Sequence, residues 1–217
     1  MTELPPIVDE TDIEGVVFGG RYKAVSKLGE GGLGAVYKGI QLNLDQDVAI
    51  KVLKPEVSSD TVLSARFKNE ARIYAKINNP HVVKVHDFGT DENDRLYLVM
   101  EFLPGRDLKG VIDNRGALDA PYMLNLAIQA VQGLDAAHAL GIVHRDIKPE
   151  NIMIQDADTD HPFARLLDFG ISKVDGDDSD DGAAVSMADA SVEFKQNLTL
   201  VGEVTGTPMF MAPEQCR

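Results

Sequence analysis

The sequence predicts an α+β protein in which a small antiparallel sheet comes first and a mostly helical part follows. Within residues 21–102, short segments alternate apolar and polar residues with the period of two that is typical of strands. One segment of that half, residues 61–77, instead carries apolar residues at helical spacing. A second, longer helical pattern runs over residues 119–140. A chain of 217 residues is long enough for one large domain or two small ones.

Composition and charge exclude several classes of protein. The net charge of −14 argues against nucleic acid or an anionic membrane as the main partner. The single cysteine, Cys216, excludes an internal disulfide and a four-cysteine zinc site. No apolar stretch approaches the ~20 residues that span a bilayer, and the N-terminal sequence lacks the pattern of a signal peptide. We therefore expect no membrane segment in this chain and a cytoplasmic location.

The N-terminal residues predict a flexible leader. Residues 1–18 are acidic, contain prolines and show no amphipathic period. The folded domain is expected over residues 19–217, and its first strand is predicted to begin at Arg21, where the alternation starts.

A glycine-rich segment follows that strand, with the spacing Gly-x-Gly-x-x-Gly at Gly29, Gly31 and Gly34. In a dinucleotide-binding fold such glycines open a helix, and an acid follows about 20 residues later, a place that Asp47 nearly fills. Residues 35–40 and 47–53, however, have the composition of strands, so no helix begins where that fold needs one. The pattern therefore favours a hairpin whose glycines let the backbone approach nucleotide phosphates.

The helix predicted over residues 61–77 has one charged residue in a costly place. A side chain at Ser58, Ser59 or Asp60 is expected to cap the helix. Glu70 lies within the spacing of the apolar residues, and an unpaired carboxylate on a buried face is expensive. Pairing with Lys51, in the preceding strand, would remove that cost. The apolar residues expected to face the core are Leu63, Phe67, Tyr74 and Ile77.

Two further strands complete the predicted sheet. Asn78-Asn79-Pro80 ends the helix, and residues 81–88 and 95–102 read as strands joined by the polar turn 89–94. The sheet then has five strands. Residues 98–105, Leu-Val-Met-Glu-Phe-Leu-Pro-Gly, lead from the sheet into the helical part, and we call this segment the linker.

The long helix of the second half is predicted from its caps and its apolar stripe. Asp119 is expected to cap a helix that extends to about Leu140, and Gly141 is its natural C-terminal stop. The stripe, which we expect to face the core, consists of Leu124, Ile128, Val131 and Leu134.

The loop from Gly141 to Asn151 is the stretch richest in chemistry, because it places an acid, a base and an amide between two apolar runs. Asp146 can accept a proton, and Lys148 can lie against a phosphate. Asn151 can offer an oxygen to a metal ion. Such a mixture is costly in apolar surroundings unless ligands or partners satisfy it.

The motifs of this chain resemble those of protein kinases, and they occur in that family's order from Arg21 to Glu214. They are the glycine-rich hairpin, Val-Ala-Ile-Lys at 48–51, His-Arg-Asp-x-Lys-Pro-x-Asn at 144–151, Asp-Phe-Gly at 168–170 and Ala-Pro-Glu at 212–214. The chain is similar to the bacterial, eukaryotic-like serine/threonine kinases, because Lys148 and Gly206-Thr207-Pro208 fit serine or threonine substrates better than tyrosine.

This resemblance implies a protein-kinase-like fold of two lobes and a reaction. The first lobe would be the sheet with its helix, over residues 19–103, and the second an incomplete helical lobe over residues 104–217. The reaction would transfer the γ-phosphate of ATP to serine or threonine hydroxyls of protein substrates.

The same resemblance implies roles for individual residues. Asp146 would be the catalytic base, and Lys148 and Lys51 would contact phosphates, with Glu70 orienting Lys51. Asn151 and Asp168 would hold Mg²⁺, with Mn²⁺ as an alternative ion. The nucleotide would be bound by Leu28, Gly29, Glu30, Gly31, Gly32, Leu33, Gly34, Ala35, Val36, Ala49, Lys51, Met100, Glu101, Leu103, Asp107 and Met153.

The segment between the Asp-Phe-Gly and Ala-Pro-Glu motifs would be the family's activation segment. Its residues 175–195 are poor in large apolar groups and rich in aspartate, which predicts a disordered acidic insert. A calcium site is the alternative, but the run lacks the spaced EF-hand pattern. Thr199, or else Thr205, is the expected phosphorylation site, with Arg145 as the partner of the phosphate.

The sequence departs from the family pattern where it ends, at Arg217 directly after Ala-Pro-Glu. We expect the chain to be part of a longer kinase. A second hypothesis is a kinase-like binding or regulatory module without turnover. The intact Lys51, Asp146 and Asp168 favour the enzyme. The sequence leaves the protein substrate, the activating signal and the oligomeric state open.

Overall fold

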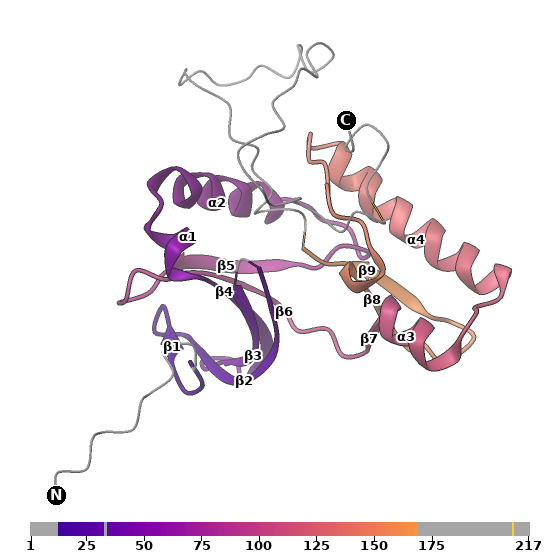
Figure 1. The fold of residues 1–217 in the computed structure, drawn as a ribbon, viewed down its shortest axis with the longest axis horizontal. Helices are drawn as coiled ribbons and strands as arrows, with labels where there is room; N and C mark the ends of the chain where they lie inside the picture. Colours follow the sequence, from indigo (N-terminus) through magenta and orange to yellow (C-terminus); the bar gives the residue numbers. More distant parts are fainter. Residues whose placement is uncertain (1–12, 33, 169–209, 211–217) are drawn as a thin grey trace, which may run out of the picture.

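The folded part of the chain consists of two lobes, which lie beside each other in Figure 1. The computed structural model describes residues 13–32, 34–168 and 210. Within these residues, the first lobe contains a six-stranded antiparallel sheet and two helices, and the second contains two helices and a three-stranded sheet. This confirms the predicted α+β architecture.

The sheet of the first lobe has the strand order β1-β2-β3-β4-β6-β5. Its helices are α1 (Pro55–Ser59) and α2 (Thr61–Tyr74), which lie over one face of the sheet (Figure 1). Asp60 accepts a hydrogen bond from the Leu63 N–H at 3.0 Å, as expected of a capping residue. The strands are β1 (Val17–Phe18), β2 (Tyr22–Gly31), β3 (Gly34–Gln41), β4 (Gln46–Leu53), β5 (Val85–Thr90) and β6 (Leu96–Glu101).

Alternation along β4 and β6 assigns side chains to two different cores. On β6, Tyr97 and Val99 belong to the core on the sheet's far face, whereas Leu98 and Met100 face α2. On β4, Ile50 joins the far core, so its neighbour Lys51 lies on the face that α2 covers. The period of the strand thus directs Lys51 toward the side of the sheet where the second lobe begins.

The sheet contains one more strand than predicted, because the chain folds earlier than expected. Ile13 and Phe18 are 4% and 0% exposed and belong to the far core of the sheet. Val17 and Phe18 form β1, which pairs with β2. The predicted leader over residues 1–18 is therefore wrong from residue 13 on, since apolar side chains in this segment find a buried surface. Residues 1–12 lie outside the described residues.

The second lobe is built around two helices and a small sheet of order β7-β8-β9. Asp107 and Asp119 cap the two helices by accepting hydrogen bonds from Gly110 N–H and Tyr122 N–H at 2.6 and 2.8 Å. The second of these caps was predicted. The elements are β7 (Arg106–Asp107), α3 (Leu108–Arg115), α4 (Ala120–His138), a 3-10 turn (Pro149–Asn151), β8 (Ile152–Gln155) and β9 (Phe163–Leu166).

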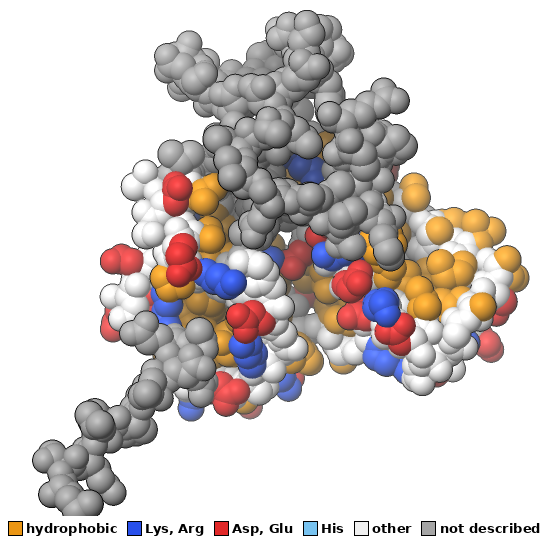
Figure 2. Space-filling view, in the orientation of Figure 1, with side chains coloured by type: hydrophobic (Ala, Val, Ile, Leu, Met, Phe, Trp, Pro, Cys, Tyr) orange, Lys and Arg blue, Asp and Glu red, His pale blue; other side chains and the backbone are white. Residues whose placement is uncertain are grey.

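The predicted burial of α4 is wrong in its main part. Leu124, Ile128 and Val131 are 63, 50 and 61% exposed, and Figure 2 shows hydrophobic side chains gathered over this helix. Only Leu134 of the predicted stripe packs against the core. The buried residues of α4 are Leu126, Gly133 and Ala137.

Close approach of the backbone explains why small residues occupy the buried face of α4. A Cβ added to Gly133 would lie 2.8 Å from the carbonyl oxygen of His81 and 3.0 Å from Leu166. A helix that is apolar on two faces does not reveal from its period which face is buried. No described helix is long and apolar enough to cross a membrane.

Substitutions on the buried and the exposed face of α4 should differ in their effect on stability. Leu126→Ala should lower the free energy of unfolding of the 217-residue chain by about 2–5 kcal/mol, because the side chain is fully buried. Leu124→Ala should change it by less than about 0.5 kcal/mol, because that side chain is largely exposed. Urea unfolding followed by circular dichroism measures both. Equal losses in the two variants would contradict the observed orientation of the helix.

Candidate active site

The glycine-rich segment forms the hairpin between β2 and β3. Gly31 pairs with Gly34 at its end. A Cβ on Gly34 would lie 2.1 Å from the carbonyl oxygen of Val52, so packing against β4 requires glycine there. A Cβ on Gly29 or Gly32 would meet no atom within 4 Å. Those two glycines thus leave open backbone that a phosphate can approach. Because a strand, β3, follows the glycines where a dinucleotide-binding fold needs a helix, that alternative is excluded.

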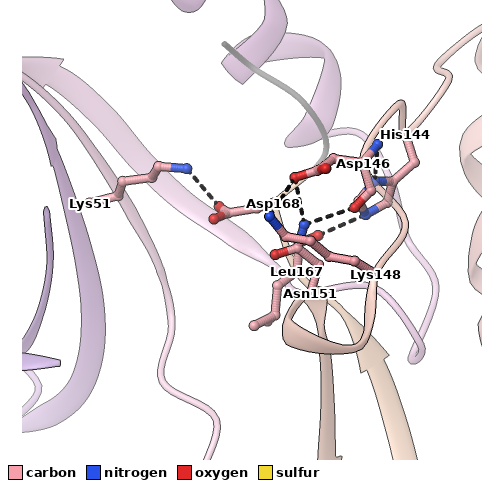
Figure 3. A network of polar contacts seen from close by, with 7 residues as sticks. All are labelled: Lys51, His144, Asp146, Lys148, Asn151, Leu167 and Asp168. Carbon is pink, nitrogen blue, oxygen red and sulfur yellow. Dashed lines mark hydrogen bonds and ion pairs between the residues drawn. The ribbon is translucent and has the colours of Figure 1, made fainter. Parts of the chain in front are cut away.

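An ion pair between the lobes is the central contact of the site. Lys51 Nζ lies 3.0 Å from Asp168 Oδ1, and the two side chains are 14% and 33% exposed. Lys51 comes from β4, whereas Asp168 lies two residues beyond the end of β9. Figure 3 shows the lysine reaching from the sheet to the aspartate. Asp168 has a φ of 39°, a left-handed conformation that non-glycine residues adopt at some cost.

Glu70 lies on α2, three residues after the buried Phe67 and four before Tyr74. Burial raises the pKa of the Tyr74 hydroxyl well above its ordinary value, and the charge of Glu70 raises it further. The carboxylate is therefore close to the interior side of α2. Its pairing with Lys51 stays a prediction, and the ion pair described for Lys51 is the one with Asp168.

The loop after α4 gathers two polar side chains around Asp146. Asn151 Nδ2 donates hydrogen bonds to Asp146 Oδ2 at 3.0 Å and to its carbonyl oxygen at 2.8 Å. Lys148 Nζ lies 3.2 Å from the same Oδ2. Because the Asn151 amide nitrogen is engaged in this way, its oxygen is oriented away from Asp146 and can act as a ligand. The loop is thereby closed around the carboxylate (Figure 3).

His144 connects that loop to the residue before Asp168. Its Nε2 lies 2.9 Å from the Leu167 carbonyl oxygen, so Nε2 carries the proton and donates. Its Nδ1 accepts a hydrogen bond from the Asp146 N–H at 3.3 Å. Burial lowers the pKa of His144, and the hydrogen bond to Leu167 opposes that shift only in part. A neutral, 1% exposed imidazole thus links Asp146 to Leu167.

The residues predicted to surround the adenine come from both lobes. Met100 and Leu103 are buried, and Ala49 lies opposite Met100 in the register of β4 and β6. Met153 pairs with Asp107 in the second lobe. A cavity behind Met100 reaches Asp168, and it is lined by Tyr74, Ile77, Val82, Val83, Val85, Leu98, Met100 and Asp168.

Several predicted residues occupy the edge of the site or fall outside the described part of the chain. Leu28 is 52% exposed, and Glu30 forms an ion pair with Lys27 at 2.5 Å. Ala35 and Val36 are partly buried on β3. Outside the described residues lie Leu33, Phe169, the insert 175–195, Thr199, Thr205 and the Ala-Pro-Glu motif.

The sequence reasoning missed Arg165. This residue lies on β9, three positions before Asp168, and its Nη1 is 2.5 Å from Glu101 Oε2 in the linker. The available signal was a single cation in the otherwise apolar run Phe163–Leu167. A charge in such a strand needs a partner.

The donor set suits a hard cation shared with phosphates. Among the described residues, no three His, Cys, Asp or Glu side chains form a metal-binding group. Asn151 and Asp168 each offer oxygen, the donor that Mg²⁺ prefers, and Mg²⁺ commonly takes one or two protein oxygens together with phosphate oxygens. The roles given to these residues stay predictions.

Two lobes joined by one linker, with charged side chains of both meeting at their junction, are the architecture of phosphotransferase domains. The chain belongs to the protein kinase domain family, whose model matches residues 22–217. Among curated relatives, it is 36% identical over 209 residues to serine/threonine-protein kinase pkn3 of Myxococcus xanthus. That match covers 96% of this chain and 36% of pkn3, so the chain spans about a third of the relative's length.

Solved structures agree with this assignment. The kinase domain of Mycobacterium tuberculosis PknI superposes with a TM-score of 0.62 and 32% identity, over 73% of this chain and 63% of that one. A crystal structure of Rad53 in complex with AMP-PNP gives a TM-score of 0.61 and 27% identity, over 70% and 38% of the two chains.

The buried neutral His144 predicts a pH dependence of stability. In the unfolded chain the histidine has the ordinary pKa of 6.5, whereas burial lowers the pKa in the folded chain. As the pH falls below 6.5, the unfolded chain takes up the proton first, so the free energy of unfolding falls. The contribution of the neutral His144 to the free energy of unfolding is therefore fully present above pH 6.5.

Replacing His144 should remove this part of the pH dependence. Urea unfolding between about pH 7.5 and 5 should show a shallower decline for His144→Asn than for the unmodified chain. His161→Asn, at an exposed position, is the matched control. If both variants change the slope equally, the assignment to His144 is wrong.

Proposed function

We propose that this chain is the catalytic domain of a serine/threonine protein kinase, which transfers the γ-phosphoryl group of ATP to hydroxyl groups of protein substrates. The observation that carries the proposal is the Lys51–Asp168 ion pair beside the Asp146 loop. The serine/threonine kinase pkn3, of which the chain matches a part, supports the choice of substrate hydroxyls.

The nucleotide is proposed to bind between the lobes. Backbone groups of Glu101 and Leu103 would bind the adenine edge, and the glycine hairpin would cover the phosphates. Asp107 is proposed to hold the ribose, although one of its carboxylate oxygens also caps α3. The similar structure of Rad53 is a complex with AMP-PNP, which supports the proposal that this chain binds a nucleotide.

The chemical step is an in-line phosphoryl transfer. The substrate hydroxyl oxygen forms a bond to the γ-phosphorus, the bond from that phosphorus to the β–γ bridging oxygen breaks, and ADP leaves. Asp146 takes the hydroxyl proton, and the hydrogen bond from Asn151 Nδ2 fixes the orientation of its carboxylate. Lys51 and Lys148 offset charge on the phosphoryl oxygens. Mg²⁺ or Mn²⁺, held by Asn151 and Asp168, would supply further charge neutralisation when bound.

The proposal also includes the surroundings of the reaction. A cytoplasmic location is supported by the single cysteine, which suits a reducing compartment. Protein substrates are the proposed partners, and the net charge of −14 makes nucleic acid a poor one. A folded domain that begins near residue 13 and includes the segment up to 217 is the proposed unit.

The decisive variant is Asp146→Asn. It should lower the rate of phosphate transfer from ATP to a serine-containing protein by about 10²–10⁴-fold, because it removes the proton acceptor. The affinity for ATP should change by less than about threefold, because the carboxylate does not bind the nucleotide base or ribose. Radiolabel transfer and calorimetry measure the two quantities. Asp113→Asn, an exposed aspartate of α3, is the control and should retain both.

Two results would count against the enzyme. Equal, background-level transfer by the unmodified chain and Asp146→Asn, with ATP binding retained in both, would favour the binding module. If the affinity for ATP is unchanged in Lys51→Ala and Asp168→Ala, the assignment of the nucleotide site to these residues is wrong.

A further inference from the structure

The carboxylate of Glu101 ties the linker to two other segments. Its Oε1 accepts a hydrogen bond from the Lys84 N–H at 2.7 Å, and its Oε2 lies 2.5 Å from Arg165 Nη1. The Glu101 N–H in turn donates to the Lys84 carbonyl oxygen at 2.9 Å. Both the main chain and the side chain of Glu101 are therefore held, although this residue ends β6.

Arg165 belongs to the other lobe, and its strand is fixed independently of Glu101. The neighbouring Leu166 donates its N–H to the His81 carbonyl oxygen at 2.8 Å and accepts from the Val83 N–H at 2.9 Å. The segment 81–84 is thus bound to β9 at one end and to Glu101 at the other. The ion pair of Arg165 with Glu101 joins β9 to the linker directly, so that β9, the segment 81–84 and Glu101 form a closed set of contacts. Asp168 lies only three residues after Arg165 in the chain.

The Arg165–Glu101 pair is more protected from solvent than the surface pairs of this protein. Its side chains are 20% and 25% exposed, against 48% and 60% for Lys109–Asp113 on α3. Within the described part of the chain, Arg165 Nε is buried and has no hydrogen-bond partner. The Phe163 ring centroid lies 5.5 Å from the guanidinium carbon. The guanidinium therefore depends on Glu101, and a pair of this kind is less screened than an exposed one.

The geometry points to Arg165 as a positioning residue for the adenine end of the nucleotide site. By holding the Glu101 carboxylate from the second lobe, it fixes the main chain of the linker relative to β9 and Asp168. The backbone groups of Glu101 and Leu103 are those proposed to bind adenine, so the inference rests on the proposed function. Arg165 touches no reacting atom and acts through Glu101.

The test compares ATP with adenosine in variants of the full chain. Arg165→Met keeps an unbranched side-chain stem and removes the charged guanidinium. It should weaken binding of ATP and of adenosine by the same factor, roughly three- to tenfold, because the defect lies at the adenine end. The KM for ATP should rise accordingly, with kcat within about twofold. Lys51→Met should instead weaken ATP far more than adenosine, because it removes a phosphate contact.

Conservative variants and a control separate positioning from a general loss of structure. Arg165→Lys should recover part of the affinity. Glu101→Gln should reproduce the effect of Arg165→Met, and the double variant should be no worse than either single one. Lys109→Met, which removes the cation of an exposed pair, should bind both ligands like the unmodified chain. Thermal unfolding midpoints establish that each variant is folded at the assay temperature.

Several results would overturn the assignment. They are unchanged affinity for both ligands, a loss confined to ATP, additive effects in the double variant, and a rise in kcat at unchanged KM. The last would mean that the pair restrains the lobes instead of positioning the linker. If Arg165→Met does not fold, Arg165→Lys and Glu101→Gln decide by the same criteria. The unmodified chain distinguishes failure of the proposed function from failure of this inference. If it neither binds nucleotide nor transfers phosphate, both proposals are refuted. If it does both, the results for the Arg165 and Glu101 variants decide the inference alone.

Discussion

The backbone and side chains of residues 164–168 hold the two lobes in one arrangement. Each of these residues contacts at least one segment distant in the sequence. Ala164 accepts from His81 Nδ1 and donates to Gln129 Oε1 of α4. Arg165 pairs with Glu101, and Leu166 bonds to the main chain of residues 81 and 83. Leu167 donates to the Asn151 carbonyl and accepts from His144, and Asp168 pairs with Lys51. Buried main-chain groups must be paired, so a shift of one residue here would leave several unsatisfied at once.

The same five residues explain how a site can form from segments about a hundred residues apart in sequence. The alternation of β4 sets the direction of the Lys51 side chain. The position of Asn151 is set by the hydrogen bond that its carbonyl oxygen accepts from the Leu167 N–H. Neither of these devices fixes the distance between the lobes. That distance depends on Leu166, which bonds to residues 81 and 83 of the first lobe, and on the continuous core of buried residues around it.

The sequence was sufficient for features that depend on local chemistry. Strand alternation predicted the sheet, and Asp119 predicted the start of α4, because periods and caps are properties of neighbouring residues. The strand β1 was missed because it has only two residues, Val17 and Phe18, and its stability comes from burial. The buried face of α4 was missed because the contact of Gly133 with His81 joins residues far apart in the chain. Arg165 was missed for the same reason, since its partner Glu101 lies 64 residues away. Long-range pairs leave only a weak local signal, here a lone cation in an apolar strand.

The charges of the site also show why the net charge of −14 does not oppose an anionic nucleotide. At physiological ionic strength the Debye length is about 8 Å, so distant surface carboxylates are largely screened. The nearby cations Lys51 and Lys148 are each within 3.2 Å of a carboxylate, Asp168 and Asp146 respectively. In each pair the lysine is a proposed phosphate ligand. Its partner is the proposed metal ligand, Asp168, or the proposed base, Asp146. Under the proposed roles, a triphosphate bound with a divalent cation would offer each lysine a phosphate oxygen and Asp168 a metal ion, so the partners could exchange without leaving a buried charge unpaired. The ion pairs Lys51–Asp168 and Lys148–Asp146 thereby hold the side chains of the proposed site together with their charges compensated.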